Sequence, residues 1–212
     1  MFPIGDRNPR RIIPWFTYLI IITNVIFFFF ELTHGAEFII RWSFIASRFI
    51  ENPLTDFPTF LTSMFMHAGW LHIAGNMLYL WIFGDNIEER FGHFKFLAFY
   101  LACGLVSTLA QMIFNLDSGI PLLGASGAIA GVLGAYIIMF PLVPVRVLLG
   151  CFIAPLPTIM VIGVWIVLQF FYGVGSLGGV AEGGVAYMAH IGGFIAGLMF
   201  TIFVRLGGRR RV

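Results

Sequence analysis

Six long and predominantly apolar stretches decide what this sequence can fold into. A helix needs about 20 such residues to cross the hydrocarbon core of a membrane. None of the six contains Asp, Lys or Arg, and the only Glu is Glu31, at the edge of the first stretch. The sequence therefore predicts an all-α membrane protein with six transmembrane helices, at residues 14–32, 60–83, 96–114, 122–140, 152–173 and 185–204.

The composition agrees with a chain that lies in a membrane. Of its 212 residues, 59% are hydrophobic and only 10% are charged, whereas a soluble domain carries about 25% charged residues. The length suits one helical domain, predicted at residues 14–205, between a short tail at 1–13 and a basic tail at 206–212. The net charge is +2 and no basic stripe lies outside the termini, so we expect contacts with membrane lipids and no nucleic-acid partner.

The basic residues predict the orientation of the chain in the membrane. With six spans, both termini lie on one side, and that side holds ten Lys and Arg residues. The other side holds two, Arg41 and Arg48. Because loops rich in Lys and Arg stay in the cytosol, we expect cytosolic termini in a multi-pass protein of the bacterial inner membrane. The sequence specifies no oligomeric state.

Two connectors between the predicted spans have an unusual composition. Residues 33–59 are rich in bulky apolar side chains, and we expect them to lie in the membrane interface. Residues 173–184 contain six glycines, which predict a mobile cover on the outer side of the membrane. In the fifth stretch, Pro155 and Pro157 indicate that the helix itself starts after them.

Two polar residues, Ser126 and His190, lie deep inside predicted spans and at matching depth. Phe140 marks the cytosolic end of the span that contains Ser126, and Arg205 closes the last span, which contains His190. At about 1.5 Å of rise per residue, both polar residues lie roughly 21–23 Å above the same membrane face. Polar side chains are costly in lipid and call for a function. A hydroxyl and an imidazole at one height suggest a nucleophile and the base that activates it.

Glycines indicate how two helices could bring these side chains together. Gly127, Gly131 and Gly134 lie along the fourth span, and Gly193 and Gly197 form a GxxxG pattern on the sixth. Small residues at such spacing let helix backbones approach closely in lipid. Plainer interpretations stay open: a serine bonded to a backbone carbonyl, a histidine in a structural hydrogen bond between helices, and glycines that serve packing alone.

The second stretch adds polar residues that suit an oxyanion site. His72 and Asn76 are four positions apart and share one helix face. With the backbone N–H of Ser126, their N–H groups would stabilise the negative oxygen that forms when an amide carbonyl is attacked. Metal binding by His67, His72 and His190 is the alternative, but His67 and His72 lack the i, i+4 spacing of a helical zinc pair. We therefore predict no metal and no cofactor.

No acidic residue accompanies the predicted base. Asp117 and Glu182 belong to predicted outer loops, and neither is placed to orient His190. The residues alone therefore favour a dyad without a third member, in which helix packing holds the imidazole.

Four motifs follow one another along the chain. They are residues 62–67 with 70–76 (TSMFMH and WLHIAGN), residues 83–88 (FGDNIE), residues 124–127 (GASG) and residues 189–193 (AHIGG). Through these motifs, which cover roughly residues 60–204, the chain closely resembles the rhomboid intramembrane serine proteases of the bacterial six-span type. GxSG alone is a weak signal, whereas GxSG, AHxxG and HxxxN, each on the appropriate span, are specific.

The resemblance implies that Ser126 is the nucleophile, that His190 is the base, and that His72, Asn76 and the backbone of Ser126 form the oxyanion site. It implies a substrate that is itself a single-pass transmembrane helix, cut at a small residue near the outer face. It also implies that the fifth span and the cover at residues 173–184 form the substrate gate, and that water reaches Ser126 through a cavity opening outward.

Two positions depart from the family's pattern. Some members carry an aromatic residue four positions after the nucleophile, packed under the base, and here that position is Ala130. Some members have Trp-Arg in the first loop, where this chain has Arg41 followed by Trp42. The resemblance therefore does not say what orients His190.

Three functions from different classes compete. The first is an intramembrane serine endopeptidase that acts through Ser126 and His190. The second is a catalytically inactive rhomboid-like protein that binds membrane clients. Such a protein would lack the nucleophile or the base, but both residues are present here. The third is a small transporter or channel lined by His67, His72 and Asn76, which would require paired ionisable groups or broken helices related by repeats. The sequence favours the first.

Overall fold

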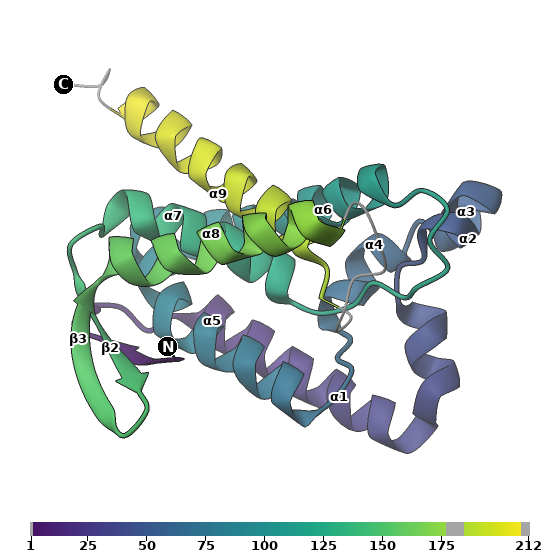
Figure 1. Cartoon of the computed structure of the whole chain (residues 1–212), viewed down its shortest axis with the longest axis horizontal. Coiled ribbons are helices and arrows are strands. Elements are labelled where there is room, and N and C mark those ends of the chain that lie inside the picture. Colours follow the sequence, from purple (N-terminus) through teal and green to yellow (C-terminus); the bar gives the residue numbers. More distant parts are fainter. Residues whose placement is uncertain (1, 177–184, 209–212) are drawn as a thin grey trace.

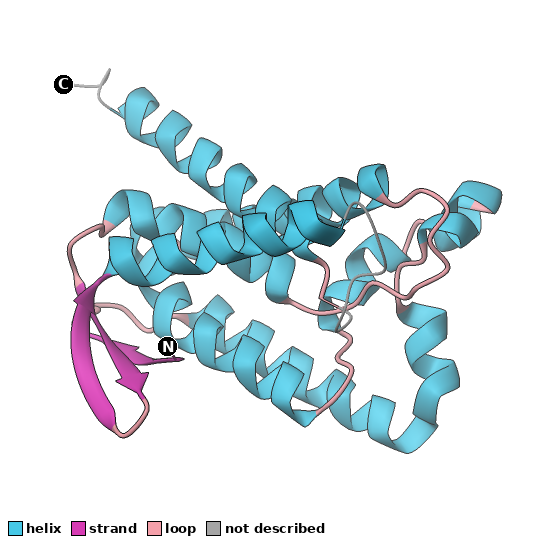
Figure 2. Cartoon of the chain, in the orientation of Figure 1, coloured by secondary structure: helices cyan, strands magenta, loops and turns pink. Residues whose placement is uncertain are grey.

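The computed structural model describes residues 2–176 and 185–208, and most of them are helical (Figures 1 and 2). Four short elements connect the first long helix to the second. The long helices are α1 (Trp15–Trp42), α5 (Trp70–Phe91), α6 (His93–Phe114), α7 (Ser126–Met139), α8 (Thr158–Ser176) and α9 (Tyr187–Gly208). The short elements are α2 (Ala46–Glu51), α3 (Pro53–Asp56), α4 (Thr59–Thr62) and the 3-10 turn η1 (Ser63–Phe65).

Four of these helices, α1, α6, α8 and α9, are long and apolar enough to cross a membrane. They coincide with four of the six predicted stretches. Helix α7 is apolar but only 14 residues long, and α5 does not meet the same criterion of length and hydropathy. The count of six spans, the cytosolic termini and the boundaries of the domain at 14–205 therefore stay predictions.

The second predicted span is wrong in its position. A single helix was expected at residues 60–83, but the helix is α5, which starts at Trp70 and continues to Phe91. The residues before it form the short turns of α4 and η1. The last two turns of α5 carry charges that a span excludes, and the structure satisfies the most buried of them, Glu88, by hydrogen bonds to the start of α1.

Two connectors are partly helical. Helix α1 runs on to Trp42 beyond a break at Gly35, where φ is 73° and ψ is −162°. Glycine reaches this left-handed φ at no steric cost, so the break changes the helix direction without ending it. Helix α8 extends to Ser176, so the first part of the predicted glycine-rich cover is helical. The rest of that cover, including Glu182, lies outside the described residues.

The prediction of an all-helical chain is wrong at one end of the molecule, where three strands form a small antiparallel sheet (Figure 2). The strands are β1 (Phe2–Asp6), β2 (Pro144–Leu149) and β3 (Phe152–Pro157), in the order β1-β2-β3. The N-terminal tail therefore includes a strand, and β3 takes the start of the predicted fifth span. Pro155 and Pro157 cannot continue a helix backwards from α8, and Val145 and Val147 alternate inward as a strand requires.

The closest helix packing is between α7 and α9, and glycine makes it possible. A Cβ atom on Gly193 would lie 2.0 Å from the carbonyl oxygen of Gly127, and one on Gly197 would lie 2.0 Å from that of Gly131. A Cβ on Gly134 would lie 2.3 Å from the carbonyl oxygen of Phe194. The predicted glycine-mediated approach of these two helices is confirmed.

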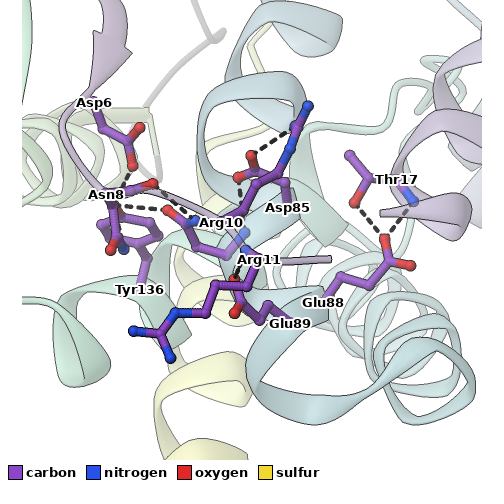
Figure 3. A network of polar contacts seen from close by, with 10 residues as sticks. Asp6, Asn8, Arg10, Arg11, Thr17, Asp85, Glu88, Glu89 and Tyr136 are labelled. Carbon is purple, nitrogen blue, oxygen red and sulfur yellow. Dashed lines mark hydrogen bonds and ion pairs between the residues drawn. The ribbon is translucent and has the colours of Figure 1, made fainter. Parts of the chain in front are cut away.

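Buried polar contacts at the sheet end attach the N-terminal segment to α5 (Figure 3). The Glu88 carboxylate accepts hydrogen bonds from the backbone N–H groups of Phe16 at 3.0 Å and Thr17 at 2.7 Å, and from the Thr17 hydroxyl at 2.7 Å. The first N–H groups of a helix have no partner within it, so Glu88 caps α1 from a neighbouring helix. Nearby, Arg10 pairs with Asp85 at 3.0 Å.

A second set of contacts in Figure 3 joins the sheet to the end of α7. The Tyr136 hydroxyl donates to the Asp6 carboxylate and accepts from Asn8 at 3.2 Å. Asn86 donates to the backbone oxygen of Asn8 at 3.2 Å. Burial raises the pKa of the Asp6 carboxyl above its ordinary value, although the Tyr136 hydroxyl acts in the opposite direction. Strand β1, α5 and α7 are thereby held together at the end of the molecule opposite the predicted site.

Candidate active site

Ser126 and His190 meet between the first turns of α7 and α9. Ser126 is the first residue of α7, and His190 lies in the first turn of α9. Nε2 of His190 is 2.8 Å from Oγ of Ser126, which is hydrogen-bonding distance. Two side chains 64 positions apart in sequence are thus brought together, as the matched depths predict.

The close approach of α7 and α9 accounts for this contact. Because glycines allow the two backbones to touch along several turns, side chains at the first turn of each helix reach one another. Gln111 of α6 also fixes the start of α9, since its Oε1 accepts a hydrogen bond from the backbone N–H of Ala189 at 3.1 Å. That N–H belongs to the first helical turn and has no partner within the helix.

Two residues of α8 orient the imidazole of His190, and the sequence prediction missed both. Oε1 of Gln169 lies 2.7 Å from Nδ1 of His190. An amide oxygen accepts hydrogen bonds but cannot donate them, so this contact places the proton on Nδ1 and the lone pair on Nε2, facing Ser126. Trp165, one turn earlier on α8, contacts the same ring, with the ring centroids 5.8 Å apart.

These two contacts replace what Ala130 cannot provide. Ala130 is fully buried and offers no ring to pack under His190. Gln169 was detectable, because it is a lone amide in an otherwise apolar span, and polar groups inside a membrane need an explanation. Among the expected outer-loop acids, Asp117 is exposed in the turn before α7, whereas Glu182 lies outside the described residues.

His72 and Asn76 lie beside Ser126, on the first two turns of α5. The backbone N–H of Ala68 donates to Nδ1 of His72 at 3.4 Å, which leaves the ring proton on Nε2. A Cβ atom on Gly124 would lie 2.8 Å from that Nε2 and 3.7 Å from Nδ2 of Asn76. Both side chains therefore reach the turn that leads into Ser126, and a side chain at position 124 would displace them.

His67 fixes the side chain of Asn76. Nδ2 of Asn76 donates to Nε2 of His67 at 2.9 Å, and this buried bond fixes the amide. The backbone N–H of His67 in turn donates to the Glu31 carboxylate at 2.9 Å. The rings of His67 and His72 are 5.0 Å apart. Within residues 2–176 and 185–208, no three His, Cys, Asp or Glu side chains gather in a way that could hold a metal ion.

A cavity of about 940 Å³ joins these groups. Its walls include Ser126, His190, His72 and Asn76, with Trp165 on the α8 side. The start of α7 also opens into it, and the first backbone N–H groups of a helix lack internal partners and carry positive potential. A substrate carbonyl in this cavity would meet a hydroxyl, an imidazole and several hydrogen-bond donors.

The fold and the cavity define the class of protein. Four helices of this mostly helical chain are long and apolar enough to cross a membrane, and three of them, α6, α8 and α9, contribute to the walls of the cavity. The chain is a multi-pass integral membrane protein. The family model for the Rhomboid domain matches residues 55–206. The chain belongs to the rhomboid family.

Three relatives show the range of this similarity. The chain is 37% identical to "Rhomboid protease GluP" of Bacillus subtilis (strain 168) over 125 residues, which cover 58% of this chain and 24% of the relative. It is 27% identical to "Rhomboid protein 1, mitochondrial" of Saccharomyces cerevisiae over 170 residues, 77% of this chain and 47% of the relative. It is 36% identical to the human "Presenilin-associated rhomboid-like protein, mitochondrial" over 98 residues, 45% of this chain and 24% of the relative. The chain thus spans at most about half the length of these relatives.

Proposed function

We propose that this protein is an intramembrane serine endopeptidase. The observation that carries the proposal is the 2.8 Å contact between Oγ of Ser126 and Nε2 of His190, at the edge of a cavity inside an apolar bundle. Membership of the rhomboid family and a relative named as a protease support it.

In the proposed reaction, Ser126 attacks the carbonyl carbon of a substrate peptide bond. A serine hydroxyl is a weak nucleophile until an adjacent base takes its proton, and Nε2 of His190 is placed to do so. The imidazolium then gives this proton to the leaving amine, and an acyl group remains on Ser126. Water, deprotonated by His190, hydrolyses the ester and restores both residues.

Gln169 acts in this scheme as a positioning residue for the base. Its amide oxygen lies 2.7 Å from Nδ1 of His190 and keeps the ring proton on that nitrogen. Nε2 therefore presents its lone pair to Ser126 before the substrate arrives. When the imidazolium forms, Nδ1–H remains a donor to the same oxygen. The dyad thus has a third, neutral partner in place of an acid.

The negative oxygen of the tetrahedral intermediate is stabilised by donors on α5 and α7. These are the backbone N–H of Ser126, Nε2–H of His72 and the amide hydrogen of Asn76 that does not bond to His67. Preorganised donors of this kind contribute about 3–4 kcal/mol each to lowering the barrier. The chemistry requires no metal and no cofactor.

The proposal extends to the substrate class, which rests on the resemblance to the rhomboid proteases. We propose that a single-pass transmembrane helix reaches Ser126 past α8 and is cut near the outer membrane face, in a protein with six spans, cytosolic termini and a place in the bacterial inner membrane. A peptide bond inside a helix is protected by its hydrogen bonds, so the cut site must unwind in the cavity, which small residues favour.

Purified protein in detergent tests the proposal with a serine-reactive fluorophosphonate probe and a tagged transmembrane-helix substrate. Ser126→Ala should abolish both labelling and cleavage, and His190→Ala should lose cleavage, with unchanged thermal unfolding. Ser118→Ala is the matched control, because Ser118 lines the same cavity while its hydroxyl accepts a hydrogen bond from the backbone of Ile120. Cleavage that persists in Ser126→Ala, or labelling lost in Ser118→Ala, would reject the assignment.

A further inference from the structure

The hairpin of β2 and β3 presents an apolar face that the helices only partly cover. Val145 and Val147 on this face are fully buried in the core. Alternate side chains of a strand point the same way, so Leu149 and its cross-strand partner Phe152 continue the face. Yet Phe152 is 79% exposed. The face that packs on the bundle therefore extends beyond its edge and stays apolar.

The opposite face of the hairpin tip is apolar as well. Leu148 pairs with Phe2 on one side and with Ile153 on the other, which forms a row across all three strands. All three are exposed, Ile153 by 61%. Residues 141–157 contain no Asp or Glu, and Arg146 is their single charge. Exposure of apolar side chains on both faces of the tip to water is energetically unfavourable.

The position of α8 places this hairpin at the membrane surface. β3 ends at Pro157, and α8 starts at the next residue, Thr158. The span Thr158–Gly175 has 18 residues, which is about 27 Å of helix against a hydrocarbon core of about 30 Å. Thr158 therefore lies close to the boundary of the core, and β3 leaves from that level.

The direction of the hairpin keeps it there. In Figure 1 the two strands run across the direction of α8 instead of continuing it. A hairpin that starts at the boundary and runs across the span stays at the depth of the headgroups. Arg146 projects from the face opposite Val145 and Val147, where lipid phosphates would meet it.

We propose that the tip of the β2–β3 hairpin inserts into the lipid leaflet on the sheet side of the membrane. Leu149 and Phe152 contact acyl chains, and Arg146 lies at the level of the phosphates. The occupant of the exposed face is lipid because the face begins at a membrane-spanning helix and because the segment has no acidic residue to repel anionic headgroups. This attachment is independent of the catalytic proposal.

The test uses the full chain reconstituted in phosphatidylcholine–phosphatidylglycerol vesicles. Cys151 at the tip is exposed and Cys103 is buried, so an environment-sensitive fluorophore can be attached to Cys151. Lipids with brominated acyl chains should quench this probe about twofold more strongly than a control probe, because an interfacial apolar segment is buried about 5–10 Å into the boundary between headgroups and acyl chains. The control carries the probe on Arg7→Cys in a Cys151→Ser background, at an exposed site next to the same sheet.

Introducing a charge provides a second measurement. Phe152→Asp should reduce bromine quenching of the Cys151 probe to the level of the control and increase quenching by aqueous iodide. Equal bromine quenching of the two probes would overturn the proposal. A Cys151 signal that depends on the protein-to-lipid ratio but not on bromine would also overturn it, since a second copy of the chain would then cover the tip.

Discussion

The role of Gln169 can be tested by removing its amide oxygen. In Gln169→Leu, the Nδ1–H of His190 loses the acceptor that lies 2.7 Å away, which is the contact that fixes the tautomer of the ring. A net hydrogen bond contributes about 1 kcal/mol, and a buried donor left without a partner costs about 1–3 kcal/mol. Since about 1.4 kcal/mol corresponds to a tenfold change in rate, kcat should fall by about 5–100-fold.

Gln169→Glu separates positioning from packing. The variant keeps the length of the side chain and an acceptor oxygen at the same place, so it should retain more activity than Gln169→Leu. The added carboxylate stabilises the imidazolium of His190, and the acid limb of the kcat/KM profile should move to higher pH. Phe170→Leu is the matched control, because Phe170 is the next residue of α8 and is exposed on the outside of the bundle.

The assays are cleavage of a tagged transmembrane helix, with kcat and KM measured separately, and the rate of fluorophosphonate labelling of Ser126. Loss in kcat with little change in KM and in thermal unfolding is the signature of a positioning residue. Rates for Gln169→Leu within twofold of the wild type, together with a Gln169→Glu profile that superimposes on it, would refute the reasoning.

Two further predictions concern stability. Gly197→Ala should lower the free energy of unfolding by about 1–3 kcal/mol, because the new Cβ would lie 2.0 Å from the carbonyl oxygen of Gly131. The control is Gly163→Ala, where no atom of the described part of the chain lies near the new Cβ. Equal melting temperatures of the two variants would contradict the prediction. Burial raises the pKa of Asp6 above its ordinary value of 3.8, so the folded state binds this proton more tightly than the unfolded state does. The contribution of the carboxyl to folding stability therefore falls as pH rises. The melting temperature of the wild type minus that of Asp6→Asn, which still offers Tyr136 an acceptor, should therefore decrease as pH rises above about 4, and a constant difference would contradict this.

The contact between Ser126 and His190 was predictable because two simple rules converge on it. Helical rise converts sequence position into membrane depth, and glycine spacing identifies helices that can touch. Both depend only on local sequence and on the thickness of the membrane. The structure adds the one quantity that these rules lack, the rotation of each helix about its axis, which turns both side chains to one cavity.

Gln169 was missed although the same reasoning applied to it. A lone amide in an apolar span needs a partner just as a lone serine does, but its partner depends on which helix α8 packs against, and hydropathy alone does not specify that. His67 shows the same difficulty: its spacing from His72 argued against a metal, and only the fold reveals that it holds Asn76 by a hydrogen bond of 2.9 Å.

The sheet and the limits of α5 were missed for a different reason. Hydropathy is averaged over a window as long as a whole span, so it cannot show that the apolar residues before a span form a strand. Pro155 and Pro157 correctly indicated that the helix starts after them, at Thr158, but not that β3 precedes it. Strand β1 pairs with β2, which lies far away in the sequence, and no local pattern reports such a pairing. At the end of α5, the charge of Glu88 argues against a buried helix only until its three hydrogen bonds to α1 are known.

The packing of the helices determines how His190 and Ser126 depend on α8. Helices α7 and α9 touch along their glycines and share the most extensive interface, whereas α8 packs chiefly on α9. Ser126 and His190 therefore lie on the two helices with the most extensive interface, and Gln169 lies on a helix with a smaller one. A substrate that displaces α8 outward would remove Gln169 from His190 without separating His190 from Ser126. In the proposed mechanism, the tautomer of His190 would then depend on whether α8 returns over the bound substrate. Closure of this side of the bundle would thereby be linked to the step in which Ser126 loses its proton.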